Sequence, residues 1–501
     1  MKYKFKNIFA NLSDVFYTKM LPEKFVQSPQ LLHFNDGLGS LLNIDHNDFQ
    51  TNLQKWIEAE IEGCESLAMV YAGHQFGHYV PRLGDGRALL LAQIEAQDRK
   101  LYDLQLKGSG LTPYSRMGDG RAVLRSCIRE YLCGEAMHRL GIPTTRALAL
   151  ITTGENVLRE EVELGSLILR VAKSHIRFGH FEYFYYTRQH EALKTLADHV
   201  IENYFPEINL VENKEKISTK SAESFAQNKY HNSPEESFAE NKYHKFLEQV
   251  ITSTATTIAK WQASGFCHGV MNTDNMSILG DTIDYGPYGF LENYDPNWIC
   301  NHSDISGRYA YQEQPAIANW NIYALSFALQ PLIPLAESAK ISQNFLRQFE
   351  EKYNELMRQK IAVNQDEIWQ DLLKIMEEAR ADYTLTFANL SKAISGDEAL
   401  FLKLFGDNKN IKLWLKNYQQ TIKKFSVEEI KTRLEKANPR YILRNWVLQT
   451  AIDDMQRNPQ STSFDEIFAM IKNPFTENNL YEKYATIAPQ NYRNLSVSCS
   501  S

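Results

Sequence analysis

The sequence predicts an α+β fold with two packed lobes, an N-terminal extension and an appended C-terminal helical region. The 501 residues exceed what one ordinary core accommodates. Strand-like apolar segments cluster in the first third, whereas helical periodicity prevails from about residue 189. We expect the extension to cover 1–75, a strand-rich lobe 76–175, a mainly helical lobe 176–340 and the appended region 341–501.

The strand-rich lobe is predicted from five apolar segments and one helix. Residues 88–94 and 102–107 are typical of short strands separated by a polar turn. Apolar residues recur at helical spacing over 121–140, and Gly141 followed by Pro143 ends that helix. Three further strands are expected, the last two joined by a turn at Glu163-Leu164-Gly165, over 145–152, 156–161 and 166–172.

The second lobe contains a local duplication. Helices are predicted over 190–204 and 245–265. Between them the nine-residue sequence ESFAQNKYH, at 223–231, recurs as ESFAENKYH at 236–244. Polar repeats of this kind are tolerated in surface loops, so we interpret about 212–244 as an expanded loop.

Composition excludes several classes of protein. Acidic residues outnumber basic ones, 61 to 54, which argues against a general nucleic-acid binder. No apolar run reaches 18 residues, so no membrane span is expected. The basic start lacks an apolar core, and the six cysteines form no CxxC pair. We therefore expect a cytoplasmic protein with reduced cysteines.

One segment has the spacing of a protein-kinase catalytic loop. His268 and Asn275 are seven positions apart, as in the kinase pattern His-x-Asp-x-x-x-x-Asn, and Asp284-Tyr285-Gly286 follows a short apolar hairpin. Asn275 and Asp284 would then supply oxygen ligands to Mg²⁺, or to Mn²⁺ in its place. The pattern predicts a protein-kinase-like two-lobed fold, against the alternative of an Asx-rich loop without a metal.

The position of the kinase catalytic acid is changed. It falls at Val270, which cannot accept a proton, and an acid stands instead at Asp274. The chain is therefore either an inactive kinase or an enzyme whose base has moved because its chemistry differs.

The strand-rich lobe supplies the residues that would hold phosphates. Lys107 ends a predicted strand and Glu130 lies 23 positions later in the predicted helix, at the spacing of the kinase Lys–Glu pair. The sequence RLGDGRALL from Arg82 recurs as RMGDGRAVL from Arg116. Such glycines let backbone amides approach phosphate oxygens. Two purely structural turns remain the alternative.

These motifs together resemble the selenoprotein O family of pseudokinase-like protein adenylyltransferases. The resemblance rests on YAGHQFG from Tyr71, QLKGSGLTPYSRMGDGR from Gln105 and HGVMNTDN from His268. It extends from Phe16-Tyr17 to the tail, apart from the duplicated insert.

The resemblance implies a kinase-like fold that binds ATP in reversed orientation and transfers AMP to protein Ser, Thr or Tyr hydroxyls. It implies Mg²⁺ on Asn275 and Asp284 and a proton acceptor at Asp274. The residues implied to contact ATP are Gly84, Gly86, Arg87, Lys107, Asp119, Gly120, Arg170, Arg177 and Asp284. Two alternatives remain: a phosphotransferase of kinase-like fold, or a non-catalytic ATP-binding scaffold.

The C-terminal cysteine suggests redox control. Many members of the family carry selenocysteine or cysteine near the C-terminus, and Cys499 stands there in a polar tail. Cys300 lies 16 positions beyond Asp284, where an activation segment would run. We hypothesise a reversible Cys300–Cys499 disulfide that lowers activity. The alternative is a buried Cys300 and a free Cys499.

Overall fold

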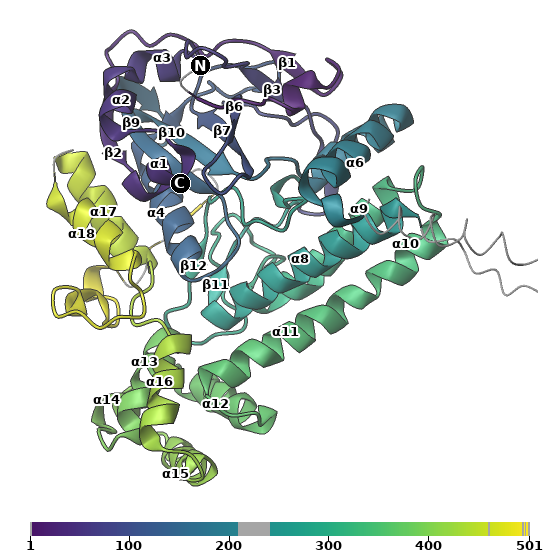
Figure 1. Ribbon diagram of the computed structural model, residues 1–501. Helices are drawn as coiled ribbons and strands as arrows, with labels where there is room; N and C mark the ends of the chain where they lie inside the picture. The colour runs from purple at the N-terminus through teal and green to yellow at the C-terminus, as the bar shows by residue number, and fades with distance from the viewer. Residues whose placement is uncertain (1–2, 209–240, 459–460, 493–494, 496, 499–501) are drawn as a thin grey trace, which may run out of the picture.

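A computed structural model describes residues 3–208, 241–458, 461–492, 495 and 497–498. It confirms an α+β fold, with a sheet at the N-terminal end and helices below it (Figure 1). Most of the duplicated insert, including its first copy, and Cys499 lie outside the described residues.

One antiparallel sheet dominates the N-terminal part. Among the described residues it has eight strands in the order β1-β3-β6-β7-β10-β9-β2, with β8 pairing to β10. Its strands are β1 (Tyr17–Lys19), β2 (Gln30–Phe34), β3 (Leu67–Met69), β6 (Ala88–Glu95), β7 (Leu101–Lys107), β8 (Ala122–Val123), β9 (Arg146–Leu158) and β10 (Val162–Ala172). Residues before 76 thus contribute three strands to the sheet.

The structure corrects the predicted pairing after residue 145. The expected strands 145–152 and 156–161 form one long strand, β9, which turns back into β10 after Leu158. Gly165 is within β10, where the register shifts between Leu164 and Ser166. A glycine inside a strand often marks such a bulge rather than a turn.

Helices cover both faces of the sheet. The outer face packs on α1 (Asp36–Leu42), α2 (His46–Thr51) and α3 (Leu53–Ile57), through a core that includes Trp56 and Leu104. The inner face packs on α4 (Leu124–Arg139), whose Ile128 and Leu132 are fully buried. Helix α4 ends before Gly141, which has a φ of +73°, as predicted from the glycine and proline.

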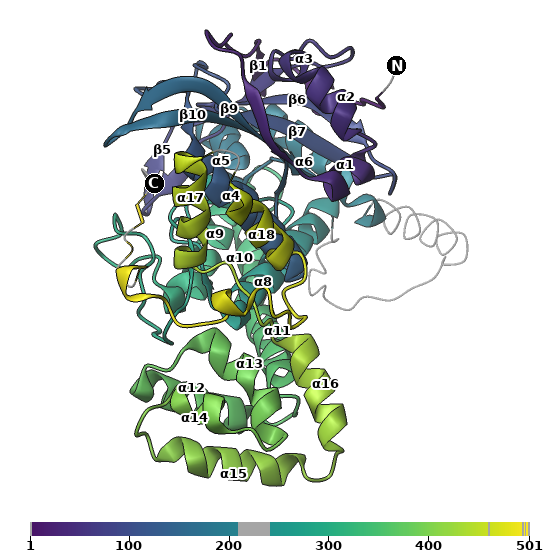
Figure 2. The same cartoon turned by 90° about the vertical axis from the view of Figure 1, so that its left-hand side faces the viewer.

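The helical part begins after β10. Its helices are α5 (Phe178–Tyr186), α6 (His190–Tyr204), α8 (Lys242–Ser264), α9 (Gln314–Ala328), α10 (Leu335–Ser342), α11 (Asn344–Lys360), α12 (Asp366–Ala379), α13 (Tyr383–Ile394), α14 (Ala399–Lys403), α15 (Asn410–Ile422), α16 (Val427–Ala437), α17 (Asn445–Arg457) and α18 (Thr462–Ile471). Helices α12 to α16 form a separate cluster at the end of α11 (Figures 1 and 2). None of the helices described is long and apolar enough to cross a membrane.

The last two helices return to the sheet. Figure 2 shows α17 and α18 beside α4, far from the cluster that precedes them in the chain. The Tyr131 ring of α4 lies 5.9 Å from the Phe464 ring and 5.8 Å from the Phe468 ring of α18. The helix that carries Glu130 is therefore supported by residues more than 300 positions later.

Two small two-stranded sheets complete the region between the large sheet and the helices. The strands β4 (Gly73–Gln75) and β5 (His78–Val80) pair with each other, as do β11 (Phe266–Cys267) and β12 (Gly289–Phe290). The short 3₁₀ helix η2 (Thr273–Asn275) contains the predicted proton acceptor. These elements surround the cavity described next.

Candidate active site

A cavity of about 870 Å³ lies between the sheet and the helical part. It is lined by all the residues that the sequence assigned to ATP, to the metal and to the base: Gly84, Gly86, Arg87, Lys107, Asp119, Gly120, Arg170, Arg177, Asp274, Asn275 and Asp284. Residues separated by up to 200 positions thus converge on one site. The volume suits a ligand of nucleotide size.

The Lys–Glu pair is formed. Lys107 Nζ lies 2.7 Å from Glu130 Oε2, and both side chains are buried. Arg170 Nη2 donates to the same carboxylate at 3.0 Å. Burial raises the pKa of Glu130, but the charges of Arg170 and Lys107 outweigh it and lower the pKa to about 2. Glu130 is therefore ionised and holds two cations at the cavity wall.

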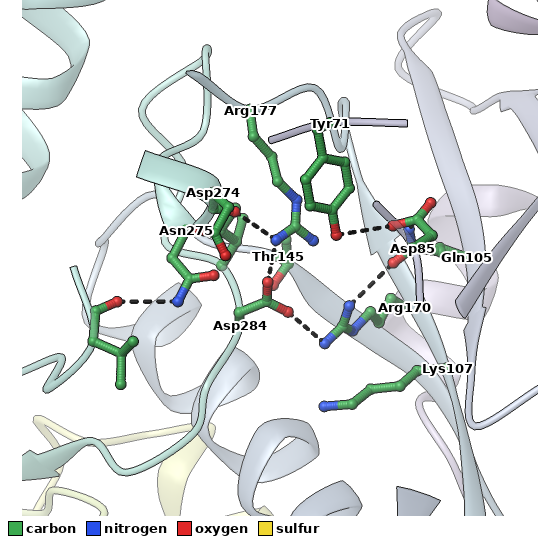
Figure 3. A network of polar contacts seen from close by, with 12 residues as sticks. Tyr71, Asp85, Gln105, Lys107, Thr145, Arg170, Arg177, Asp274, Asn275 and Asp284 are labelled. Atoms are coloured by element: carbon green, nitrogen blue, oxygen red, sulfur yellow. Dashed lines mark hydrogen bonds and ion pairs between the residues drawn. The ribbon is translucent and has the colours of Figure 1, made fainter. Parts of the chain in front are cut away.

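Asp284 is held by two arginines. Its Oδ1 accepts from Arg170 Nη2 at 2.8 Å and its Oδ2 accepts from Arg177 Nη1 (Figure 3). Burial raises its pKa, whereas Arg177, Arg170 and Lys107 lower it, and the net pKa lies well below the usual range. The Asp284 backbone has a φ of +56°, a conformation that non-glycine residues adopt mainly at special sites.

Asp274 is the least satisfied carboxylate of the site. Its Oδ2 accepts from Gln75 Nε2 at 3.1 Å, and its Oδ1 is buried without a hydrogen-bond partner. Burial raises its pKa to about 7, although the charge of Arg177 lowers it. A carboxyl that gives and takes a proton near neutral pH fits a general base.

The side chains of the two predicted metal ligands are oriented toward each other. Asn275 Nδ2 donates to the Val270 carbonyl at 3.1 Å, and its amide oxygen faces the Asp284 carboxylate in Figure 3. Within the described part of the chain no cluster of three His, Cys, Asp or Glu could hold a metal alone. Mg²⁺ is typically held by one or two carboxylates together with substrate phosphates. The two oxygen donors, Asn275 and Asp284, fit a metal that arrives with a nucleotide.

Glycines that line the cavity allow neighbouring parts of the chain to pack closely against the backbone. Gly84 has a φ of +88°, and a Cβ there would lie 2.5 Å from the Tyr114 ring. At Gly120, with a φ of +71°, a Cβ would lie 2.1 Å from the Gly110 carbonyl carbon. Asp119 beside it forms an ion pair with Arg159 at 2.7 Å, and this contact lowers its pKa. The second glycine segment thus forms an ordered cavity rim.

His268, the first residue of the catalytic-loop motif, is structural. It is buried, its Nε2 lies 2.9 Å from the Ile283 carbonyl, and its Nδ1 accepts from the Val270 amide at 3.3 Å. These contacts join the catalytic loop to the strand-like segment that precedes Asp284. The imidazole fixes backbone and does not face the cavity.

The β4–β5 hairpin is the part of the site that sequence reasoning missed. Gln75 supports Asp274, and the Phe76 amide donates to Asn272 Oδ1 at 3.2 Å. His74 Nδ1 lies 2.6 Å from Glu182 Oε1, and the other oxygen of Glu182 accepts from the Thr273 hydroxyl. His74, Gln75 and Phe76 lie within the YAGHQFG motif of the family resemblance, but no role in the site was predicted for them.

Cys300 is buried in the structure. Its thiol donates to the Cys267 carbonyl at 3.4 Å, and burial raises its pKa well above the usual value. The His302 amide donates to the Val497 carbonyl at 2.8 Å, so the tail runs beside this loop. The partner in the hypothesised disulfide, Cys499, lies outside the described residues.

The arrangement is typical of a nucleotide-handling enzyme: a cavity of nucleotide size with buried cations, neighbouring amide and carboxylate oxygens, and a carboxylate whose pKa is near neutral. A family model described as protein adenylyltransferase SelO matches residues 1–472. The chain belongs to this family, and is a nucleotidyltransferase of the protein adenylyltransferase class.

Full-length relatives agree with the family. The chain is 41% identical to the protein nucleotidyltransferase YdiU of Vibrio vulnificus strain CMCP6 over 515 residues, which cover 99% of each protein. It is 40% identical to the protein of the same name from Photobacterium profundum over 99% of this chain and 98% of the relative. With the Myxococcus xanthus strain DK1622 protein it shares 41% identity over 99% of both.

Proposed function

We propose that the chain transfers AMP from ATP, with Mg²⁺ or alternatively Mn²⁺, to Ser, Thr or Tyr hydroxyls of other proteins. The observation that carries the proposal is that the Asp274 carboxyl, whose Oδ2 is held by Gln75, lines the same cavity as Asn275 and Asp284. The acid stands at Asp274, and Val270 occupies the position of the kinase catalytic Asp. This arrangement suits transfer of AMP, which contains the α-phosphate, and not of the γ-phosphate that kinases transfer.

The fold that we propose is protein-kinase-like, with two lobes around the cavity. The Lys107–Glu130 pair and Asp284-Tyr285-Gly286 support this arrangement. We propose an extension over 1–75, an N-terminal lobe over 76–175, a C-terminal lobe over 176–340 and an appended helical region over 341–501.

Positive charge in the cavity would hold the triphosphate. Lys107, Arg170 and Arg177 are buried cations at its wall, and Arg87 adds an exposed one. The glycine segments bring backbone amides to the same space. In the orientation that the family resemblance implies, the γ-phosphate is deepest and the α-phosphate faces the acceptor, so the reacting phosphorus lies near Asp274.

The reaction is an in-line displacement. The acceptor hydroxyl oxygen forms a bond to the α-phosphorus, the bond to the bridging oxygen breaks, and pyrophosphate leaves with that electron pair. Asp274 accepts the hydroxyl proton. Asn275 and Asp284 would hold the metal, whose chemistry when bound is neutralisation of phosphate charge. Arg170 and Arg177 position Asp284 and contribute further charge.

Isotope labelling tests the proposal. The protein is incubated with ATP labelled on the α- or γ-phosphate and with a protein mixture, and acid-stable label on protein is measured. Transfer of the α-label alone is expected. Transfer of the γ-label would indicate a phosphotransferase, and no transfer with retained ATP binding would indicate a scaffold.

Substitution of Asp274 makes the test specific. Asp274→Asn should lower transfer by about 10²–10⁴-fold, the usual contribution of a general base, with little change in ATP affinity. The matched control is Asp281→Asn, because Asp281 lies on the neighbouring turn and does not line the cavity. Equal loss of transfer and of ATP affinity in Asp274→Asn would contradict the assignment as base.

A further inference from the structure

A second cavity, of about 680 Å³, adjoins the nucleotide cavity. Phe76 lines both cavities, so they share one wall. The second cavity is lined by the turn of the β4–β5 hairpin, the loop 297–312 and the start of α9. Its lining combines the apolar side chains of Ile299 and Ile317 with the charged side chains of Arg308 and Glu313.

The shared wall is directly coupled to the proton acceptor. Gln75 donates to Asp274 Oδ2, and the next residue, Phe76, is held by Asn272 and by the Tyr309 hydroxyl at 3.0 Å. The Phe76 backbone has a φ of +50°, which is strained for an aromatic residue. A ligand that packs on Phe76 therefore lies one residue from the group that supports Asp274.

An exposed apolar surface continues from the second cavity. Trp320, Tyr323 and Phe327 are at helical spacing on one face of α9, and between 37% and 40% of each is exposed. Ile299 and Ile305, on the loop before α9, are 40% and 96% exposed. Exposed apolar side chains that gather in one patch mark interaction sites on soluble proteins, and Trp320 joins this face of α9 to the cavity through its contact with Arg308.

Arg308 is available for an anionic partner. Its guanidinium lies over the Trp320 ring at 5.1 Å and within 5.8 Å of the Tyr309 ring. Within the described part of the chain Arg308 forms no ion pair, and it lines the second cavity, as does Glu313. Aromatic contacts fix the plane of the guanidinium, so a bound carboxylate would meet a preorganised cation.

We propose that the second cavity and the exposed face of α9 bind an extended segment of the acceptor protein. An apolar or aromatic side chain of that segment packs on Phe76 and Ile299, and an acidic side chain pairs with Arg308. A cavity of this volume is about 9 Å across, or about three residues of extended chain. Both anchors therefore lie within about four residues of the modified hydroxyl. The inference rests on the proposed function, because only a protein acceptor has such a segment.

A peptide library tests the inference. Synthetic 13-residue peptides carry one central Ser, Thr or Tyr and random flanking residues, and are incubated with α-labelled ATP and enzyme. The wild type should select an acidic residue at one flanking position and an apolar residue at another. Arg308→Glu should reduce selection of the acid by about tenfold, which is about 1.4 kcal/mol, or replace it with selection of Lys or Arg.

Controls separate docking from catalysis. Arg347→Glu is the matched control, because Arg347 is 61% exposed on α11 and lies outside both cavities. ATP affinity should be the same in Arg308→Glu and the wild type, since Arg308 does not line the nucleotide cavity. Ile299→Ala should weaken selection of the apolar residue while acid selection persists, because Ile299 lines the second cavity and is not one of the two rings that contact Arg308.

The outcomes distinguish this inference from the proposed function. Two results would overturn the docking site and leave AMP transfer intact. One is unchanged selection of the acidic residue by Arg308→Glu. The other is α-label on folded proteins or on the enzyme itself, but on no peptide. Absence of α-label from every peptide and protein would overturn the proposed function, and the docking site with it.

Discussion

Lys360 is a buried cation in the helical region, and its replacement should stabilise the protein. It ends α11, it is 6% exposed, and within the described residues no carboxylate forms an ion pair with it. Its ammonium lies 4.3 Å from the Phe387 ring centroid and 5.4 Å from that of Tyr383. Burial lowers its pKa from 10.5 to about 7.

The pKa shift fixes the sign and size of the effect. Above pH 10.5 the lysine is neutral in the folded and the unfolded chain and causes no penalty. As the pH falls toward 7, only the unfolded chain gains a proton, so stability falls, by about 4 kcal/mol near pH 7. Near pH 7 part of the folded lysine is also charged, and the ring contacts stabilise this form, which reduces the penalty by about 1–2 kcal/mol. Lys360→Met should therefore raise the free energy of unfolding by about 3 kcal/mol near pH 7 and by about 1 kcal/mol near pH 9.5.

Urea denaturation followed by tryptophan fluorescence at the two pH values measures the difference. Because a chain of this size unfolds in more than one step, the comparison uses the transition that includes Trp369 and Trp414, which fluoresce within the same helical cluster. Lys374→Met on α12 is the matched control, since Lys374 is 71% exposed. A Lys360→Met variant whose stability relative to wild type is the same at both pH values would refute the reasoning.

Three further predictions concern the active site. Asp284→Ala should reduce AMP transfer by about 10³-fold and remove the dependence of ATP binding on Mg²⁺, both measurable by label transfer and calorimetry; retained wild-type turnover would contradict the metal assignment. Lys107→Ala and Glu130→Ala should each abolish most transfer, and their double variant should lose little more, whereas independent, multiplicative losses would argue against a working pair. Glu130→Ala should also lower stability, by about 3–5 kcal/mol, because the buried Lys107 loses its carboxylate partner and Arg170 keeps only Asp284. Mild oxidation should yield a Cys300–Cys499 linked peptide and lower activity, both reversed by reductant; no such peptide in mass spectrometry, or full activity with the link present, would end the hypothesis.

Local sequence signals predicted the elements that carry several residues of the site, whereas most of the residues assigned to ATP were implied by the family resemblance. The spacing places His268 and Asn275 on one loop and Asp284 on the segment that follows it. Because the loop has a fixed length, the spacing limits which side chains can lie near one another. Lys107 ends a strand and Glu130 lies within a helix, as their flanking patterns indicated. In such cases the geometry follows from a few neighbouring residues.

Contacts between residues far apart in the chain could not be predicted from the sequence in the same way. His74 and Thr273 are 199 positions apart, and the hydrogen bond from the His74 amide to the Thr273 hydroxyl oxygen at 2.7 Å depends on how the sheet and the helices dock. The merging of two predicted strands into β9 has a similar cause: tertiary pairing with β10 overrides the polar residues around Gly154. No periodicity in the sequence contains that information.

The return of α17 and α18 to α4 has a consequence for synthesis on the ribosome. Tyr131 obtains its packing from Phe464 and Phe468, which are translated more than 300 residues after it. Until those residues leave the exit tunnel, one side of the helix that carries Glu130 is exposed to water, and the Lys107 pair lacks its final support. A nascent or prematurely terminated chain therefore contains every described residue that lines the nucleotide cavity, the last being Pro287, before α4 has all of its packing.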